Sequence, residues 1–305
     1  MQFDGIWFNR VLIASAVLLA FAAGLLASHG AGQVEYVPRM CPVAETRRSF
    51  TQKHKTDVVM FVPTPVPWED RRAAVHRQFV REGWHDRQVV LLFVLGTVNT
   101  DVSGVKVYAQ ARYLHVPCYD EGDRFNEAGD QSATTCKVYE ALKHVYAHYE
   151  ARYVWRGADD SHVNLPYFFK MAHTLPASRL FYGRLRKETA HQDDLSLDRQ
   201  PKLKELYGLL QFGQYMHGMG FVFSYDVVEF VAELKIPPHL TWCEDVMVGM
   251  WLNPFQVRFV DAGLLFQDPW YEPVNFQRDY LLVHRMTPEQ WRALPRNRVN
   301  ASLLL

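Results

Sequence analysis

Two short apolar runs on either side of a helix-like segment constrain the fold of this chain more than any other feature. The first run is residues 58–62 (VVMFV), which a proline-rich turn follows, and the second is residues 89–95 (VVLLFVL). Runs of this length, rich in β-branched residues and bounded by turn residues, are typical of buried strands. Residues 69–82 between them have apolar side chains at helical spacing among arginines. The order strand, helix, strand predicts an α/β fold with a parallel sheet that is covered on both faces.

Further elements of the same kind follow along the chain. The pattern predicts an acidic loop at 120–130, a long helix from Ser132 through Tyr149, strands at 153–155 and 180–182, and a polar segment at 191–204. The strand at 153–155 leads directly into Asp159 and Asp160. Carboxylates at the C-terminal end of a strand lie where an open α/β sheet binds its ligand.

The N-terminus carries an uncharged apolar segment, residues 11–28 (VLIASAVLLAFAAGLLAS), preceded by Arg10. A cleaved signal peptide is one interpretation, because Ala27 and Ser28 are small residues near a possible cleavage point. The length of the segment and the short stretch before it favour an uncleaved membrane anchor. The single charge at Arg10 favours a cytoplasmic tail and a luminal body. The predicted organisation is a cytoplasmic tail at 1–10, a transmembrane signal-anchor at 11–28, a stem at 29–55 and a luminal catalytic domain at 56–305.

Charge and cysteine content exclude some functions. Lys+Arg and Asp+Glu are both 33, and this balance argues against a nucleic-acid partner, which requires a basic surface. The cysteines have no CxxC spacing, so a zinc site is not expected. In a luminal protein they permit two disulfides with three possible connectivities, or some are buried thiols: Cys41, Cys118, Cys136 and Cys243. A glycosylation sequon occurs at Asn300.

Two pairs of acidic residues are candidates for chemistry. Asp159 and Asp160 could hold a hard divalent cation, which in turn neutralises a diphosphate; alternatively, they cap the N-terminus of a helix. Glu244 and Asp245 stand inside an apolar run, where a charge is costly unless it is paired or functional. An acid in such surroundings suits general-base work on a sugar hydroxyl, and capping of a helix at 246–251 is the alternative.

Two further features are weaker in isolation. Gly218 and Gly220 do not form a GxGxxG pattern and no strand clearly leads into them, which disfavours a dinucleotide fold. Closely spaced glycines instead suggest backbone that a ligand can approach. His284 follows an apolar run near the C-terminus, and a lone histidine is more often structural than a metal ligand.

Taken together, the segments from about residue 57 to 292 resemble the family 31 β-1,3-glycosyltransferases. The similar segments are residues 72–79 (RAAVHRQF, against RxxIRxTW), 89–96 (VVLLFVLG, against VVFLLG), 156–164 (RGADDSHVN, against KTDDDVFVN), 215–224 (YMHGMGFVFS, against YCSGGGYVLS), 244–249 (EDVMVG, against EDVYVG) and 284–291 (HRMTPEQW). Lys137 falls where the family has a lysine in the helix before the metal motif. The most specific of these motifs is EDVxVG.

The resemblance implies a GT-A type single-domain nucleotide-sugar transferase fold with an N-terminal transmembrane helix. Asp160 matches the acid that binds Mn²⁺, His284 the histidine that completes the site, and Asp245 the base that takes the acceptor proton for inverting attack. The nucleotide-sugar site would further include Arg72, Asp159, Gly218, Gly220 and Glu244. His162 could add a ligand, although the aromatic residue that the family has there favours packing.

The implied partners are a UDP-sugar donor, a glycan acceptor and, through the N-terminal helix, the Golgi membrane, with the catalytic domain in the lumen. The acidic loop and residues 156–162 are similar to divergent kinetoplastid β-1,3-glycosyltransferases, including phosphoglycan galactosyltransferases, which favours galactose over N-acetylglucosamine. Ala158 replaces the first Asp of the family motif, and His76 replaces an arginine. These departures motivate an alternative, a non-catalytic luminal binding protein or chaperone. A metal-dependent hydrolase that uses the same acids is a third class.

Overall fold

The computed structural model describes residues 52–84, 88–98, 100–120, 132–186, 213–234, 243–270, 273–276, 279–287 and 290–291. These residues all belong to the unit Thr51–Leu305. The predictions for the apolar segment at 11–28, Cys41, the loop at 121–130, the polar segment at 191–204 and Asn300 lie outside the described residues. Among the helices that the structure describes, none is both long and apolar enough to cross a membrane.

The described part of the chain is built on a sheet of seven strands in the order β3-β2-β1-β4-β7-β6-β8. Strands β3, β2, β1 and β4 are parallel, β7 runs antiparallel to both of its neighbours, and β8 is parallel to β6. The α/β prediction is confirmed, although the sheet is mixed and not purely parallel. The strands are β1 (His54–Pro63), β2 (Val89–Val98), β3 (Ala111–Tyr119), β4 (Tyr149–Gly157), β6 (Leu180–Arg186), β7 (Tyr215–Ser224) and β8 (Arg258–Asp261).

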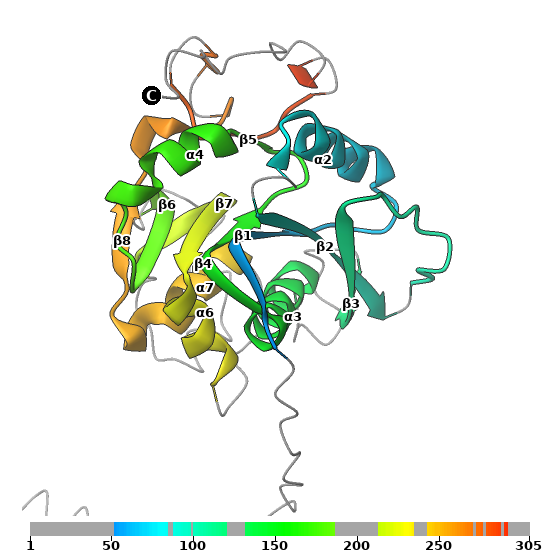
Figure 1. Ribbon diagram of the computed structural model, residues 1–305, viewed down its shortest axis with the longest axis horizontal. Helices are drawn as coiled ribbons and strands as arrows, with labels where there is room; N and C mark the ends of the chain where they lie inside the picture. The colour runs from blue at the N-terminus through cyan, green and yellow to red at the C-terminus, as the bar shows by residue number, and fades with distance from the viewer. Residues whose placement is uncertain are drawn as a thin grey trace, which may run out of the picture. The chain divides into compact units, whose positions relative to one another are not determined.

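Helices cover both faces of this sheet (Figure 1). One face carries α2 (Glu69–Arg81) and α4 (Leu165–Met171), and the other carries α3 (Ala133–His148), α6 (Tyr225–Ala232) and α7 (Glu244–Leu252). The helix predicted at 69–82 is confirmed, and so is the start of the long helix, because the Ser132 hydroxyl caps α3 by accepting from the amide of Thr135. Three short 3-10 helices complete the described elements: η2 (Ala172–Thr174), η5 (Asn253–Phe255) and η6 (Gly263–Leu265).

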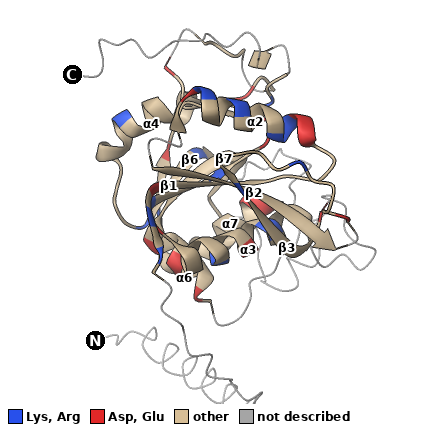
Figure 2. Cartoon of the chain, turned by 45° about the vertical axis from the view of Figure 1, so that its right-hand side comes forward, with Lys and Arg blue, Asp and Glu red and all other residues tan. Residues whose placement is uncertain are grey.

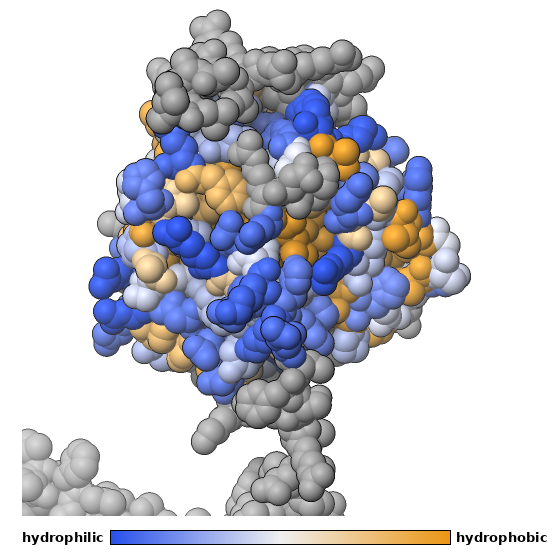
Figure 3. Space-filling model, in the orientation of Figure 1, coloured by the Kyte–Doolittle hydropathy of each residue, from blue (hydrophilic) through white to orange (hydrophobic). Residues whose placement is uncertain are grey.

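Strand β1 shows why the sheet needs helices on both sides. Val58, Met60 and Val62 pack into the core on the α2 side, while Val59 and Phe61 pack into the core on the α3 side. All five side chains are buried, and each contributes roughly 1.5–3 kcal/mol through burial. On the face drawn in Figure 3, hydrophilic residues predominate and smaller apolar areas lie between them.

A second, smaller sheet joins distant parts of the chain. Its strands are β5 (His162–Val163), β10 (Leu282–Val283) and β9 (Phe266–Gln267), in that order. Val283 pairs with His162 in antiparallel register, and Leu282 pairs with Phe266 in parallel register. Strand β5, which follows β4 in the chain, is therefore held beside β10, and β10 is held beside β9.

The structure differs from the prediction or extends it at several points. Strands β3 and β7 were not predicted, and the glycines at 218 and 220 lie inside β7. The acids at 159–160 do not begin a helix, because a turn and β5 follow them, and Asn164 caps α4 instead. Tyr149 ends the predicted helix but belongs to β4. Cys118 and Cys136 form a disulfide that ties β3 to α3.

Candidate active site

Asp159 and Asp160 lie just beyond the C-terminal end of β4, where β1 and β4 run parallel. Asp159 is buried and accepts a hydrogen bond from the Thr64 hydroxyl (2.7 Å), at the end of β1. Arg71, in the first turn of α2, donates to Asp159 (3.2 Å) and lies 3.9 Å from an oxygen of Asp160. The guanidinium of Arg71 also packs over the ring of Trp68, 4.1 Å from its centroid. The strand end thus carries two acids that one arginine contacts.

His284 joins these acids to a third carboxylate. Its Nε2 lies 3.2 Å from Oδ1 of Asp160, and its Nδ1 lies 3.0 Å from Oδ2 of Asp268. The side chain of Asp268 is fully buried. Among the described residues, no group of three or more His, Cys, Asp or Glu side chains is arranged to hold a metal ion. Asp268 contacts the opposite ring nitrogen from Asp160, so it orients the imidazole instead of sharing a site with Asp160.

Backbone hydrogen bonds fix this arrangement. The amide of Met286 donates to the carbonyl of Asp160 (2.9 Å), and the amide of His284 donates to the carbonyl of Gln267 (2.9 Å). These bonds continue the pairing of β10 with β5 and β9. Asp160, His284 and Asp268 come from three separate segments, and the small sheet brings them together.

The ionisation of these groups follows from their contacts. Burial raises the pKa of Asp159 above its ordinary value despite the hydrogen bond from Thr64. Burial also acts to raise the pKa of Asp160, but His284 and Arg71 outweigh it, so that this pKa is lowered. For His284 burial acts downward, but the hydrogen bonds to Asp160 and Asp268 raise its pKa.

Asp245 lies in the first turn of α7, and Glu244 precedes it. Oδ2 of Asp245 accepts from the amide of Gly218 (2.9 Å), and Oδ1 lies 3.3 Å from the thiol of Cys243. Burial raises the pKa of Asp245 despite these hydrogen bonds. Both acids lie at the N-terminal end of α7, where the helix dipole favours negative charge. This position agrees with the alternative in which the two acids serve the start of a helix. Glu244, however, is buried in an ion pair with Arg156 (2.9 Å).

His217 lies between the two groups of acids. Its ring centroid is 6.1 Å from that of His284, and its Nδ1 accepts from the amide of Met219 (3.2 Å). Burial, and after it the charges of Arg186 and His284, lower the pKa of His217 to about 3, so this imidazole is neutral at pH 7. The next residue, Gly218, contacts Asp245. His217 and the backbone amide of Gly218 therefore connect His284, which contacts Asp160, with Asp245.

The glycines of β7 are needed for contacts within the protein. A Cβ on Gly218 would lie 3.2 Å from Oδ2 of Asp245. At Gly220, φ is +149°, and a Cβ there would lie 2.6 Å from a methyl carbon of Leu282. The close approach predicted at these glycines is thus made by Asp245 and Leu282.

Arg72 does not lie where the sequence suggested. It is buried, and its guanidinium donates to the backbone carbonyls of Pro65 and Val66. The arginine that reaches the acids is its neighbour, Arg71. Two acids begin α2, and arginines follow them along the helix (Figure 2).

Lys137 of α3 holds together the strand ends next to the site. Its ammonium group donates to the carboxylate of Asp120 (2.9 Å) and to the carbonyl of Thr64 (3.0 Å), and both charged side chains are almost fully buried. Asp120 also accepts from the amides of Gly96 (2.9 Å) and Val66. This ion pair fixes the ends of β1, β2 and β3, and thereby the loop that carries Thr64.

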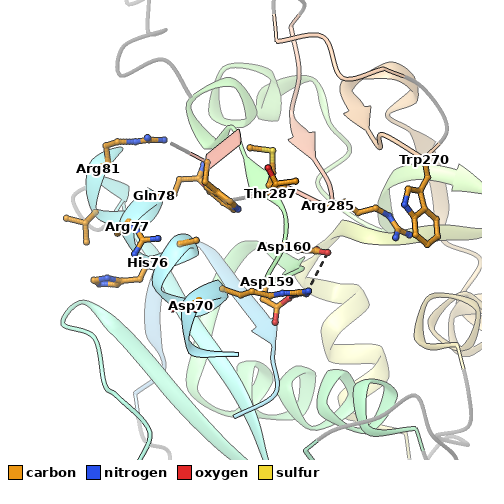
Figure 4. A pocket seen from close by; sticks show the side chains of 15 residues that line it. Asp70, His76, Arg77, Gln78, Arg81, Asp159, Asp160, Trp270, Arg285 and Thr287 are labelled. Atoms are coloured by element: carbon orange, nitrogen blue, oxygen red, sulfur yellow. Dashed lines mark hydrogen bonds and ion pairs between the residues drawn. The ribbon is translucent and has the colours of Figure 1, made fainter. Parts of the chain in front are cut away.

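A cavity of about 1350 Å³ opens at the acids. It runs between α2 and the segment that carries Arg285 and Thr287, as Figure 4 shows. Its wall combines acidic, basic and aromatic side chains. These include Asp159, Asp160, Arg71, Arg77, Arg81, Arg285 and Trp270. A volume of this size accommodates a large polar ligand next to the candidate metal-binding pair.

Comparison with known proteins defines the class of this protein: it is a glycosyltransferase. It belongs to the galactosyltransferase family, whose model matches residues 70–262. It is 25% identical over 226 residues to β-1,3-galactosyltransferase 1 of Mus musculus and of Homo sapiens, which covers 70% of this chain and 67% of theirs. The predicted resemblance to β-1,3-galactosyltransferases is confirmed.

Solved structures give weaker likenesses. The galactosyltransferase LgtC in complex with donor and acceptor sugar analogues is 12% identical with a TM-score of 0.37, covering 76% of this chain and 87% of that chain. Glucosyl-3-phosphoglycerate synthase from Mycobacterium tuberculosis, in complex with Mn²⁺ and UDP, is 15% identical with a TM-score of 0.33, covering 56% and 58%. At such TM-scores these likenesses do not bear on the function of this chain.

Asp268, Arg71 and Asp120 are among the residues of the site that were not predicted from the sequence. Asp268 stands in a stretch without a recognisable motif, and only the pairing of β9 with β10 brings it to His284. Arg71 precedes the arginine that the family motif matches. Asp120 opens the acidic loop, where nothing in the sequence separates it from the other acids.

Proposed function

We propose that the protein transfers galactose from UDP-galactose to a glycan acceptor hydroxyl, with inversion, to form a β-1,3 linkage in a reaction that depends on Mn²⁺. The observation that carries the proposal is the contact of Asp160 with His284 (3.2 Å) at the end of β4, beside a cavity of about 1350 Å³. The family assignment supports galactose, and UDP-N-acetylglucosamine is the second candidate donor. The proposal includes a GT-A type for the fold.

The donor set fits Mn²⁺, because carboxylate oxygen and neutral imidazole nitrogen both suit this ion. Asp160 and Nε2 of His284 would hold it, and two protein ligands leave coordination positions for diphosphate oxygens. When bound, the ion neutralises the charge that develops on the diphosphate leaving group. Asp268 accepts from Nδ1–H of His284, which turns Nε2 toward Asp160.

The remaining roles fall to the chain's own side chains. Arg71 is half exposed beside both acids, and we assign it, in place of Arg72, to the phosphates of the donor. Asp245 is assigned as the general base that takes the proton of the acceptor 3-hydroxyl. The oxygen then forms its bond to the anomeric carbon while the bond to the diphosphate breaks on the opposite side, so the α-linked donor yields a β-linked product and UDP. Asp159, which lines the cavity, is assigned to the wall of the donor site. Gly218, Gly220 and Glu244, which the resemblance also assigns to that site, are not among the residues that line this cavity.

The proposal extends to location. A type II membrane protein of the Golgi, anchored by residues 11–28 with residues 56–305 in the lumen, is consistent with a nucleotide-sugar donor and with a disulfide between Cys118 and Cys136. Protease protection of sealed Golgi vesicles tests this arrangement. We expect the body to be digested only after detergent is added, and digestion in intact vesicles would contradict it.

The experiment that tests the function is a titration of the full-length protein in mild detergent with UDP-galactose and UDP-N-acetylglucosamine, with Mn²⁺ and with chelator. We expect one donor to bind only with Mn²⁺, and we expect binding to be lost in Asp160→Ala. The matched control is Asp101→Ala, which removes an exposed carboxylate in a loop away from the cavity. If neither donor binds to well-folded protein, the transferase proposal fails and the non-catalytic binding protein takes its place.

A further inference from the structure

Trp270 is the most exposed of the large apolar side chains at the cavity. It lines the cavity and is 72% exposed. The guanidinium of Arg285 lies over its ring, 3.0 Å from the centroid. An indole that lines a polar cavity and is held in place by a stacked guanidinium offers a flat apolar face to a ligand in that cavity.

Its position is fixed by the same carboxylate that orients the candidate metal ligand. Oδ1 of Asp268 accepts from the amide of Trp270 (2.9 Å) and lies 3.3 Å from Nε of Arg285. Oδ2 of Asp268 contacts His284 (3.0 Å). The fully buried Asp268 therefore sets the indole, the guanidinium beneath it and the imidazole relative to one another.

The indole lies on the side of the acids that faces away from α2. In Figure 4, Trp270 and Arg285 are on one side of Asp160, and the side chains of α2 are on the other. Asp245 is also reached from the His284 side, because His217 packs near His284 and Gly218 contacts Asp245. Arg71, assigned to the donor phosphates, belongs to α2. Trp270 thus lies on the side of Asp160 away from α2 and Arg71, and the proposed base is connected to His284 through His217 and Gly218.

We propose that Trp270 is a platform on which a sugar ring of the acceptor packs. The inference rests on the proposed function, because it takes Asp245 as the base and Arg71 as a phosphate contact. A pyranose ring has an apolar face of C–H groups, which packs against an aromatic ring and removes apolar surface from water. Arg285 covers one face of the indole and leaves the remainder for the ligand.

The test compares wild type with Trp270→Ala, Trp270→Phe and Leu264→Ala. Leu264 is another exposed apolar side chain, 58% exposed, which does not line the cavity. The acceptor probes are the methyl β-glycosides of galactose, glucose, mannose and N-acetylglucosamine, observed by saturation-transfer NMR on full-length protein with UDP and Mn²⁺. The donor is titrated separately, with Mn²⁺, in each variant.

We expect at least one glycoside to bind wild type, with Kd about tenfold higher in Trp270→Ala, an intermediate value in Trp270→Phe and no change in Leu264→Ala. Donor affinity should be unchanged in all variants. The proposal is overturned if no glycoside binds wild type, if glycoside affinity in Trp270→Ala stays within twofold, or if that variant loses donor affinity. Failure of donor binding in wild type itself would instead contradict the proposed function, so the two failures are distinguishable.

Discussion

Replacing Lys137 by Met should destabilise the protein strongly. The ammonium group of Lys137 is the cation that contacts the buried carboxylate of Asp120 (2.9 Å), and the two side chains are 2% and 0% exposed. Breaking a buried ion pair by removing one partner costs about 3–5 kcal/mol, because the other charge remains buried and uncompensated. For a body of this size, about 2–3 °C is lost per kcal/mol, so the melting temperature should fall by roughly 10 °C.

Thermal unfolding of full-length protein in mild detergent, followed by circular dichroism, measures this loss. The matched control is Lys143→Met on the same helix, whose surface pair with Glu140 is 44% and 24% exposed and is worth about 0–1 kcal/mol. Adding Asp120→Asn to Lys137→Met should recover part of the stability, since the double variant leaves no unpaired charge. A melting temperature of Lys137→Met within 2 °C of wild type would refute the argument that this pair is buried and essential to the strand ends.

Three further predictions concern the site and the fold. Asp268→Asn should weaken Mn²⁺ affinity about 10- to 100-fold, because His284 loses the partner that orients it. The transfer rate is measured as a function of Mn²⁺ concentration, and donor affinity is measured separately. A Mn²⁺ dependence equal to that of wild type would contradict the prediction. Burial raises the pKa of Asp245, so this base becomes protonated at a higher pH than an ordinary Asp does. As the pH is lowered through that raised pKa, kcat/KM should therefore decrease. A kcat/KM that stays constant as the pH is lowered to the ordinary Asp range argues against this base. Replacing Cys118 and Cys136, which are 18 residues apart, by Ser should cost about 3 kcal/mol, measured by denaturant unfolding; equal midpoints would mean that the disulfide does not constrain the unfolded chain.

The sequence predicted the elements whose apolar pattern is strong. Strands β1, β2 and β4 and helix α2 were found because their buried faces are read directly from spacing. Strand β7 was missed because glycines interrupt it, and glycines weaken a strand pattern without excluding a strand. Strand β3 was missed because its burial is patchy.

The site was predicted as far as local motifs reach. Asp160, His284 and Asp245 were named from their segments, and the structure brings Asp160 and His284 within 3.2 Å. Asp268 could not be named, because its role arises from the pairing of β9 with β10. Whether Arg71 or Arg72 faces the acids depends on how α2 is rotated about its axis relative to β1 and β4. The sequence motif does not fix this rotation. Sequence therefore gives the chemistry, whereas long-range pairing decides which side chains share it.

The most direct test of the proposed transfer is the anomeric configuration of its product. Full-length protein with Mn²⁺, UDP-galactose and p-nitrophenyl β-glycosides of galactose and N-acetylglucosamine would be incubated, and the product analysed by NMR. We predict a β-linked galactose on the 3-hydroxyl from wild type and no product from Asp245→Asn. An α-linked product, or undiminished product from Asp245→Asn, would contradict inverting transfer with Asp245 as the base.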